Sequence, residues 1–93
     1  ERARLRARAR GVAANRQLRG AALERCAPLG ADALGVLRDR LSAGTLTMRG
    51  AQRVRAVALT LMDLDGSDGP LDAEHIHVAL SLRTHSQALG VAA

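Results

Sequence analysis

Two arginines at the start of one expected helix are the side chains of this sequence best placed to bind a ligand. The stretch TLTMRGAQRVRAVALTLMDLDG, residues 45–66, holds Arg49 and Arg53 four residues apart. At about 100° per residue the two side chains lie about 40° apart and project together. Because the start of a helix is itself positive, two cations there favour a shared anion. The alternative is that both arginines are solvated or paired with acids of another helix.

The same helix ends in acids, where its dipole favours bases. Asp63 falls on the stripe of Arg49 and Arg53, and Asp65 follows it. Each misplaced charge opposes the helix dipole by about 0.3–1 kcal/mol, so an anionic partner outside the helix would explain the arginines. The apolar residues expected to form the core face of this helix lie on another side of it, and they are Val54, Val57, Leu61 and Leu64.

No residue pattern indicates a catalytic centre. His75 and His77 are two residues apart, about 200° round a helix, so they cannot bind one metal ion from one face. Cys26 is the only cysteine and is expected to be a small core residue. The sequence contains no phosphate-binding loop and no cluster with metal-ligand spacing. We therefore predict no catalytic residue and no metal site in this chain.

The basic charge is concentrated at the N-terminus. All 14 basic residues are arginines, and residues 1–20 hold seven of them against one acid. Arginines at every second position point in all directions on a helix, so we expect a basic helix that buries no full face of its own. Such a helix could neutralise nucleic-acid phosphates. The chain has no Phe, Tyr or Trp to stack on bases, however, so a solvated or domain-packed helix is favoured.

The composition favours an all-α fold, because Ala, Leu and Arg are abundant and β-branched residues are few. The 93 residues fit one small bundle of about four helices with the basic N-terminal helix. We place the domain at residues 1–83 and expect a frayed, flexible tail over residues 84–93. No segment has the apolar length of a membrane span, and a single cysteine fits a reducing compartment. We expect a cytoplasmic protein without membrane contact.

Local signals place the ends of the helices. A short helix is expected over Gly20–Cys26, ended by Pro28. Gly44 is the C-terminal signal of the next helix, and Thr47 is the expected N-cap of the helix that carries the two arginines. Asp72 caps the last helix. The inward stripe of that helix is expected to contain Ile76, Ala79 and Leu80.

Three stretches together resemble a known module. They are R-G…N-x-x-L-x-G-x-x-L…C-x-x-L from Arg10 to Leu29, then LTMRGAQRV…LTLMDLDG, then LDAEHIHVALSLR. In order and spacing they are similar to the C-terminal domain of magnesium-chelatase-like AAA+ ATPases. Within that family they resemble the ComM-type bacterial branch, which is associated with competence and with branch migration of DNA. The resemblance covers residues 5 to 83.

This resemblance implies that the domain is the helical lid of an AAA+ module. ATP and Mg²⁺ would be bound mainly by an upstream ATPase core, and the lid would supply the sensor-2 arginine near the γ-phosphate. The parent would act on DNA as a homo-oligomeric ring, with a hexamer expected. Because the chain opens at Glu1 without an initiator Met, we expect it to be a fragment of that longer chain, inactive alone.

Arg49 and Arg53 match the family pattern and are the predicted cofactor-binding residues, with Arg53 the first choice for the sensor. A third arginine of the pattern is replaced by Ala56, so the choice between the two stays open. His75 and Arg83 also match. Two other functions remain: the lid of a true magnesium chelatase subunit working on porphyrin, and a small helical DNA-binding or adaptor domain that never meets ATP.

Overall fold

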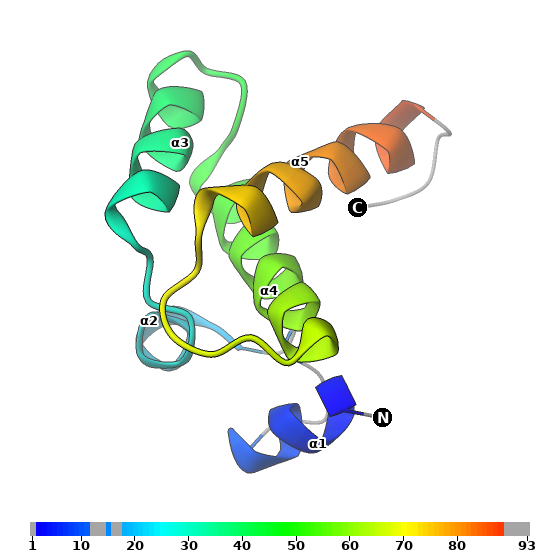
Figure 1. The fold of residues 1–93 in the computed structure, drawn as a ribbon. Helices are drawn as coiled ribbons and strands as arrows, with labels where there is room; N and C mark the ends of the chain where they lie inside the picture. Colours follow the sequence, from blue (N-terminus) through cyan, green and yellow to red (C-terminus); the bar gives the residue numbers. More distant parts are fainter. Residues whose placement is uncertain (1, 12–14, 16–17, 89–93) are drawn as a thin grey trace.

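Five α-helices make up the part of the chain that the computed structural model describes, which is residues 2–11, 15 and 18–88 (Figure 1). They are α1 (Arg2–Ala9), α2 (Gly20–Cys26), α3 (Ala31–Ser42), α4 (Met48–Asp65) and α5 (Ala73–Ala88). These described residues contain no strand, although an isolated bridge pairs Leu29 with Leu71. The predicted all-α class is confirmed.

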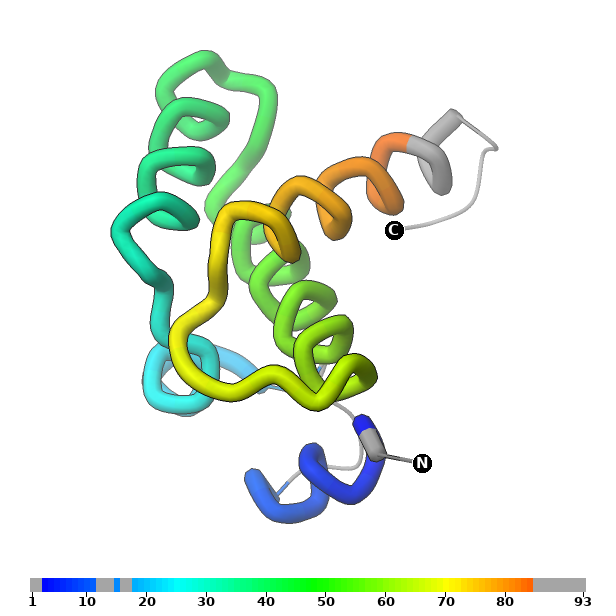
Figure 2. The backbone as a smooth tube through the Cα atoms, in the orientation of Figure 1, coloured from blue at the N-terminus to red at the C-terminus, as the bar shows by residue number. Residues whose placement is uncertain are grey.

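Helix α4 is the centre of the fold, because it packs against each of the other four helices. Helices α3 and α5 also contact each other. Figure 2 shows α5 crossing α4, with α1 beside the opposite, C-terminal end of α4. The hydrophobic core gathers between α2, α3, α4 and α5, and its most deeply buried members are Leu23, Ala27, Ala33, Ala58, Leu71 and Ile76.

The predicted caps begin and end the helices around α4. Thr47 caps α4, since its Oγ1 accepts a hydrogen bond from the backbone N–H of Gly50 at 3.0 Å. Asp72 caps α5 in the same way through the N–H of His75, at 2.8 Å. Gly66 ends α4 with a φ of 77°, a left-handed conformation that glycine adopts without strain.

Helix α4 buries a different face from the predicted one. Val54 is buried and Leu61 partly buried, but Val57 is 39% exposed and Leu64 is 55% exposed. The prediction was wrong for Val57 and Leu64, because the four neighbouring helices cover other sides of α4. The apolar residues that α4 actually buries are Ala51, Val54, Ala56, Ala58, Leu59 and Met62.

The last helix follows its predicted stripe. Ile76, Ala79 and Leu80 are 0%, 2% and 6% exposed. Helix α5 runs on to Ala88, while residues 89–93 of the expected tail lie outside the described residues. None of the helices in the described ranges combines the length and apolar character that a membrane crossing requires.

Two backbone hydrogen bonds join the link before α3 to the link after α4. The N–H of Gly30 donates to the carbonyl of Leu71 at 2.9 Å, and the N–H of Leu71 donates to the carbonyl of Pro28 at 2.8 Å. A Cβ atom on Gly30 would lie 3.1 Å from the Leu71 oxygen, so glycine permits this close approach. The tie fixes the start of α5, and with it the direction in which α5 crosses α4.

Replacing Thr47 tests how α4 begins. Thr47→Ala leaves the Gly50 N–H without its acceptor, which should lower the free energy of unfolding by about 1 kcal/mol. Thr47→Ser keeps the hydroxyl and should stay close to the parent protein. Urea unfolding followed by circular dichroism measures both, and equal midpoints for all three proteins would contradict the capping role.

Candidate functional site

A basic pocket lies beside the first turn of α4. We define it by its lining residues, around a volume of about 200 Å³; these are Thr47, Arg49, Gly50, Arg53 and Arg83. The lining presents three guanidinium groups, one hydroxyl and no carboxylate. Because the adjoining helix N-terminus is also positive, this set of groups suits an anion.

The basic pocket draws on two helices. Arg49 and Arg53 come from α4, whereas Arg83 comes from α5 and is partly buried. Gly50 makes the approach of Arg83 possible, since a Cβ atom there would lie 3.2 Å from Nη2 of Arg83 and 3.0 Å from Cδ1 of Leu46. The absent side chain of Gly50 therefore leaves the space in which the guanidinium of Arg83 reaches α4.

The structure brings the two predicted arginines together. Arg49 and Arg53 are both exposed and line the same pocket, as their common stripe requires. Their role in cofactor binding stays a prediction. Ala56, the third position singled out on this helix in the sequence, is 5% exposed and does not line the pocket.

Arg83 was missing from the predicted site residues, although its spacing carried a signal. It falls seven residues after Ile76 and three after Leu80, so it continues the inward stripe of α5. A charged residue on an inward stripe must find a polar environment. Here that environment is the open basic pocket.

The positive character extends beyond this pocket. A second hollow of about 130 Å³ shares Thr47 and Arg83 with the basic pocket and adds Arg40 from the end of α3. The other residues that line it are Gly44, Thr45, Leu46, Leu80 and Thr84. No carboxylate lines either hollow, so the two present a continuous surface suited to anions.

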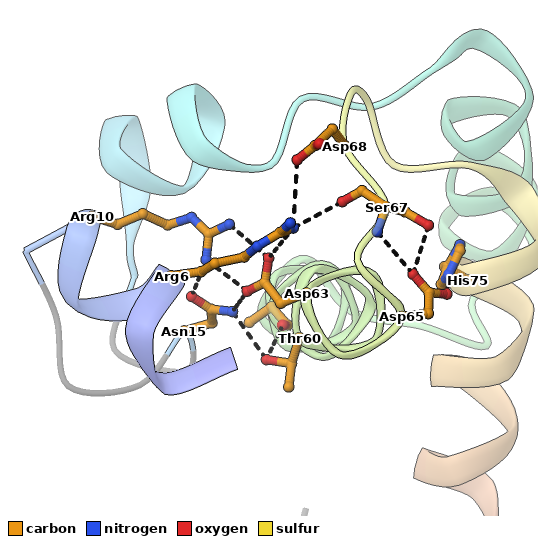
Figure 3. A network of polar contacts seen from close by, with 10 residues as sticks. Arg6, Arg10, Asn15, Thr60, Asp63, Asp65, Ser67, Asp68 and His75 are labelled. Atoms are coloured by element: carbon orange, nitrogen blue, oxygen red, sulfur yellow. Dashed lines mark hydrogen bonds and ion pairs between the residues drawn. The ribbon is translucent and has the colours of Figure 1, made fainter. Parts of the chain in front are cut away.

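At its far end, α4 carries a buried acid. The side chain of Asp63 is 1% exposed, and its two oxygens accept hydrogen bonds from Nη1 and Nη2 of Arg10 at 2.7 and 2.8 Å (Figure 3). Asn15 donates from Nδ2 to Asp63 at 2.8 Å and accepts from Arg10 at 2.8 Å. Nη1 of Arg6 lies 3.5 Å from Asp63. We call Arg6, Arg10, Asn15 and Asp63 the Asp63 cluster.

The cluster keeps Asp63 charged. Burial alone would raise the pKa of this carboxyl, but the hydrogen bonds from Arg10 and Asn15 outweigh burial and hold the pKa below its usual value. The same contact with Asp63 raises the pKa of Arg10. The sequence showed Asp63 at an unfavourable end of its helix, and the structure supplies the compensating charges from α1.

The remaining arginine of α4, Arg55, holds helices together. It is 9% exposed; its Nη2 donates to the carbonyl oxygen of Ala27 at 2.6 Å, and its Nη1 donates to Glu24 at 3.2 Å. Ala27 is the C-cap of α2, where carbonyl groups lack helical partners. Arg55 therefore fixes the end of α2 against α4.

A histidine joins α4 to α5. Nε2 of His75 lies 2.7 Å from Asp65, and Nδ1 lies 2.7 Å from Asp72. These contacts, Asp65 first, raise the pKa of His75. Hydrogen bonds from Ser67 and then His75 lower the pKa of Asp65 to about 2. His77 is exposed, and the described residues contain no group of three or more His, Cys, Asp or Glu side chains that could hold a metal ion.

The stability of the protein should fall with rising pH because of His75. Its folded pKa lies above the unfolded value of 6.5. Protonated His75 therefore stabilises the fold below about pH 6.5, and this contribution is lost as the pH rises through the raised pKa. Urea unfolding between about pH 6 and about pH 9 should show a smaller decline for His75→Gln than for the parent. His77→Gln is the matched control and should decline like the parent; the same decline in His75→Gln would contradict the role of His75.

Comparison with known proteins gives one finding. Residues 1–83 match the family described as magnesium chelatase, subunit ChlI C-terminal. No curated protein and no solved structure matched. The matched span contains every residue of the basic pocket and of the Asp63 cluster. The chain belongs to the family of magnesium chelatase subunit ChlI C-terminal domains.

Proposed function

We propose that this chain is the C-terminal lid of a ComM-type, magnesium-chelatase-like AAA+ ATPase, and that Arg53 and Arg49 bind phosphate groups of ATP. The basic pocket carries the proposal, because it gathers arginines from two helices at a helix N-terminus with no carboxylate in its lining. Family membership over residues 1–83 supports the AAA+ context.

The chemistry of the lining fits ATP and does not fit Mg²⁺. Guanidinium N–H groups donate to phosphate oxygens, and the hydroxyl of Thr47 stands beside them. Mg²⁺ takes carboxylate and water oxygens, which these arginines cannot replace. When bound, ATP supplies the phosphoanhydride bond that the parent cleaves. The arginines of the lid neutralise phosphate charge, while the upstream core holds most of the nucleotide and its Mg²⁺.

Arg53 and Arg49 have separate places in this proposal. Arg53 lies nearer the middle of α4 and close to the Ala56 position of the family pattern, so we assign it the sensor role. Arg49 lies in the first turn, where it can reach a neighbouring subunit of a homo-oligomeric ring, which we take to be a hexamer. The parent would work in the cytoplasm on DNA.

Two substitutions test the phosphate contact in the full-length parent protein. Arg53→Ala should lower ATP turnover tenfold or more, which corresponds to about 1.4 kcal/mol of lost stabilisation. Arg38→Ala removes an exposed arginine of α3 that lines neither hollow, and it should leave turnover unchanged. Unfolding free energies of both variants control for misfolding. Full turnover in both Arg53→Ala and Arg49→Ala would refute the proposal.

The family match also fits the lid of a true magnesium chelatase subunit. Turnover measurements on the same parent protein distinguish the two. A DNA-acting parent should hydrolyse ATP faster when branched or duplex DNA is added. A chelatase subunit should be unaffected by DNA and should support insertion of Mg²⁺ into porphyrin together with its partner subunits.

One observation favours a DNA-binding or adaptor domain that does not bind ATP. Arg4 and Arg8 are exposed on α1, on the side turned away from the Asp63 cluster. A DNA-binding or adaptor domain predicts that the 93-residue chain binds duplex DNA with micromolar affinity and a steep dependence on salt. The lid proposal predicts weak or no binding. A fluorescence titration at two salt concentrations decides between them.

A further inference from the structure

Helix α1 is attached to the protein by charge rather than by apolar packing. Ala7 is 1% exposed, but Leu5, the largest apolar residue of α1, is 62% exposed. The hydrophobic core cluster runs from Leu18 to Leu80 and includes no residue of α1. A helix of eight residues is unstable in isolation. The attachment of α1 therefore depends on Arg6 and Arg10.

The arginines of α1, together with Arg10 directly after it, face in two directions. Arg6 and Arg10 are four residues apart and turn inward, whereas Arg4 and Arg8 lie about 160–200° away from Arg6 and are exposed. The inward pair reaches a single carboxylate, that of Asp63. Two of the five alternating arginines are thus committed to one buried acid.

Asp63 joins segments that are distant in sequence. Arg6 approaches from α1 and Arg10 from the residue just after it, 57 and 53 residues away from Asp63. Asn15 approaches from further along the chain. Asn15 also donates to Oγ1 of Thr60 at 3.1 Å, one turn earlier on α4. Arg6 donates at 3.0 Å to the carbonyl of Ser67, just after α4 (Figure 3). One carboxylate therefore organises α1, the link after it and the end of α4.

The cost of leaving Asp63 buried and unpaired favours the docked position of α1. A buried carboxylate without its cations is strongly disfavoured, and Asp63 also lies in the last turn of α4, where the dipole opposes an acid. Docked α1 removes both penalties. Without the charge of Asp63, Arg10 loses both of its ion-pair hydrogen bonds. Helix α1 then keeps the burial of Ala7 and the contacts of Arg6 with Ser67 and the exposed Asp68. The hydrophobic core cluster of α2–α5 contains no residue of the Asp63 cluster.

We propose that the Asp63 cluster is a latch that docks α1 on α4 as a separable unit, and that Asp63 is a positioning residue for the basic pocket. The second part rests on the proposed function, in which the chain before α1 leads to the ATPase core. Arg53 lies ten residues before Asp63 on α4, about 15 Å along a rigid helix. The docked α1 thus sets where α4 presents its arginines relative to the core.

Amide hydrogen exchange on the 93-residue chain tests the latch. In Asp63→Asn, the protection of amides 6–10 should fall tenfold or more, while amides in the middle of α4 and α5 stay within about threefold of the parent. Asp68→Asn is the matched control, because Asp68 also lies 3.5 Å from Arg6 but is 88% exposed. It should leave the protection of α1 unchanged.

Two outcomes would overturn the latch. One is unchanged protection of α1 in Asp63→Asn. The other is loss of protection throughout the chain in both Asp63→Asn and Arg10→Gln, which would make α1 part of one cooperative unit. Arg10→Gln guards against a general folding defect, because it leaves Asp63 with Asn15 and Arg6. It should also release α1 selectively, and global loss of protection in both variants refutes separability.

A double-mutant cycle in the full-length parent tests positioning. Asp63→Asn should lower kcat/KM for ATP tenfold or more with the folded α2–α5 core intact. If Asp63 acts through Arg53, then Arg53→Ala combined with Asp63→Asn should be no slower than Arg53→Ala alone. Normal turnover in Asp63→Asn, or fully additive losses, would overturn positioning. Normal turnover in both Arg53→Ala and Arg49→Ala would instead refute the proposed function, and the exchange result for the latch would still stand.

Discussion

The charges at the two ends of α4 are the constraint on which the rest of the structure depends. This helix runs through the centre of the fold, yet it has no acid in its first turn and no base in its last. Both ends oppose the helix dipole. Charges from outside the helix can offset this cost, which is about 0.3–1 kcal/mol for each misplaced charge.

At the C-terminal end, the compensation comes from within the chain. Asp63 is neutralised by Arg6 of α1 and by Arg10, which directly follows α1. Asp65 is bound by His75 of α5. These contacts explain why a short, highly charged α1 is docked at all and why the turn after α4 leads directly into α5. At the N-terminal end, the basic pocket gathers three guanidinium groups beside the start of a helix, and the partner we propose for Arg49 and Arg53 is a phosphate.

Local features were predictable from the sequence, and contacts between distant segments were not. Thr47 and Asp72 cap their helices as predicted, because a cap depends on residues within one turn. The common stripe of Arg49 and Arg53 follows from helical periodicity alone. The exposure of Val57 and Leu64 could not be foreseen, since it depends on which side of α4 each neighbouring helix covers.

The ion pairs made by α1 and Arg10 were likewise not predictable from the sequence. Alternating arginines on a helix gave no reason to expect that one pair would turn inward, because their partner lies 53 residues away in sequence. The place of Arg83 in the basic pocket also depends on tertiary packing. It is set by how α5 crosses α4 and by the space left at Gly50. The grouping of Arg49 and Arg53 on one helix was predictable, whereas their meeting with Arg83 of a second helix was not.

Arginine NMR on the isolated chain tests the central claim most directly. In a titration with inorganic tripolyphosphate, the Nε–Hε signals of Arg49, Arg53 and Arg83 should shift together along one saturable curve. The signals of Arg25 and Arg38, which line neither hollow, should stay in place and serve as internal controls. Equal, non-saturating shifts of all these arginines, or no shift at all, would contradict an anion site at the start of α4.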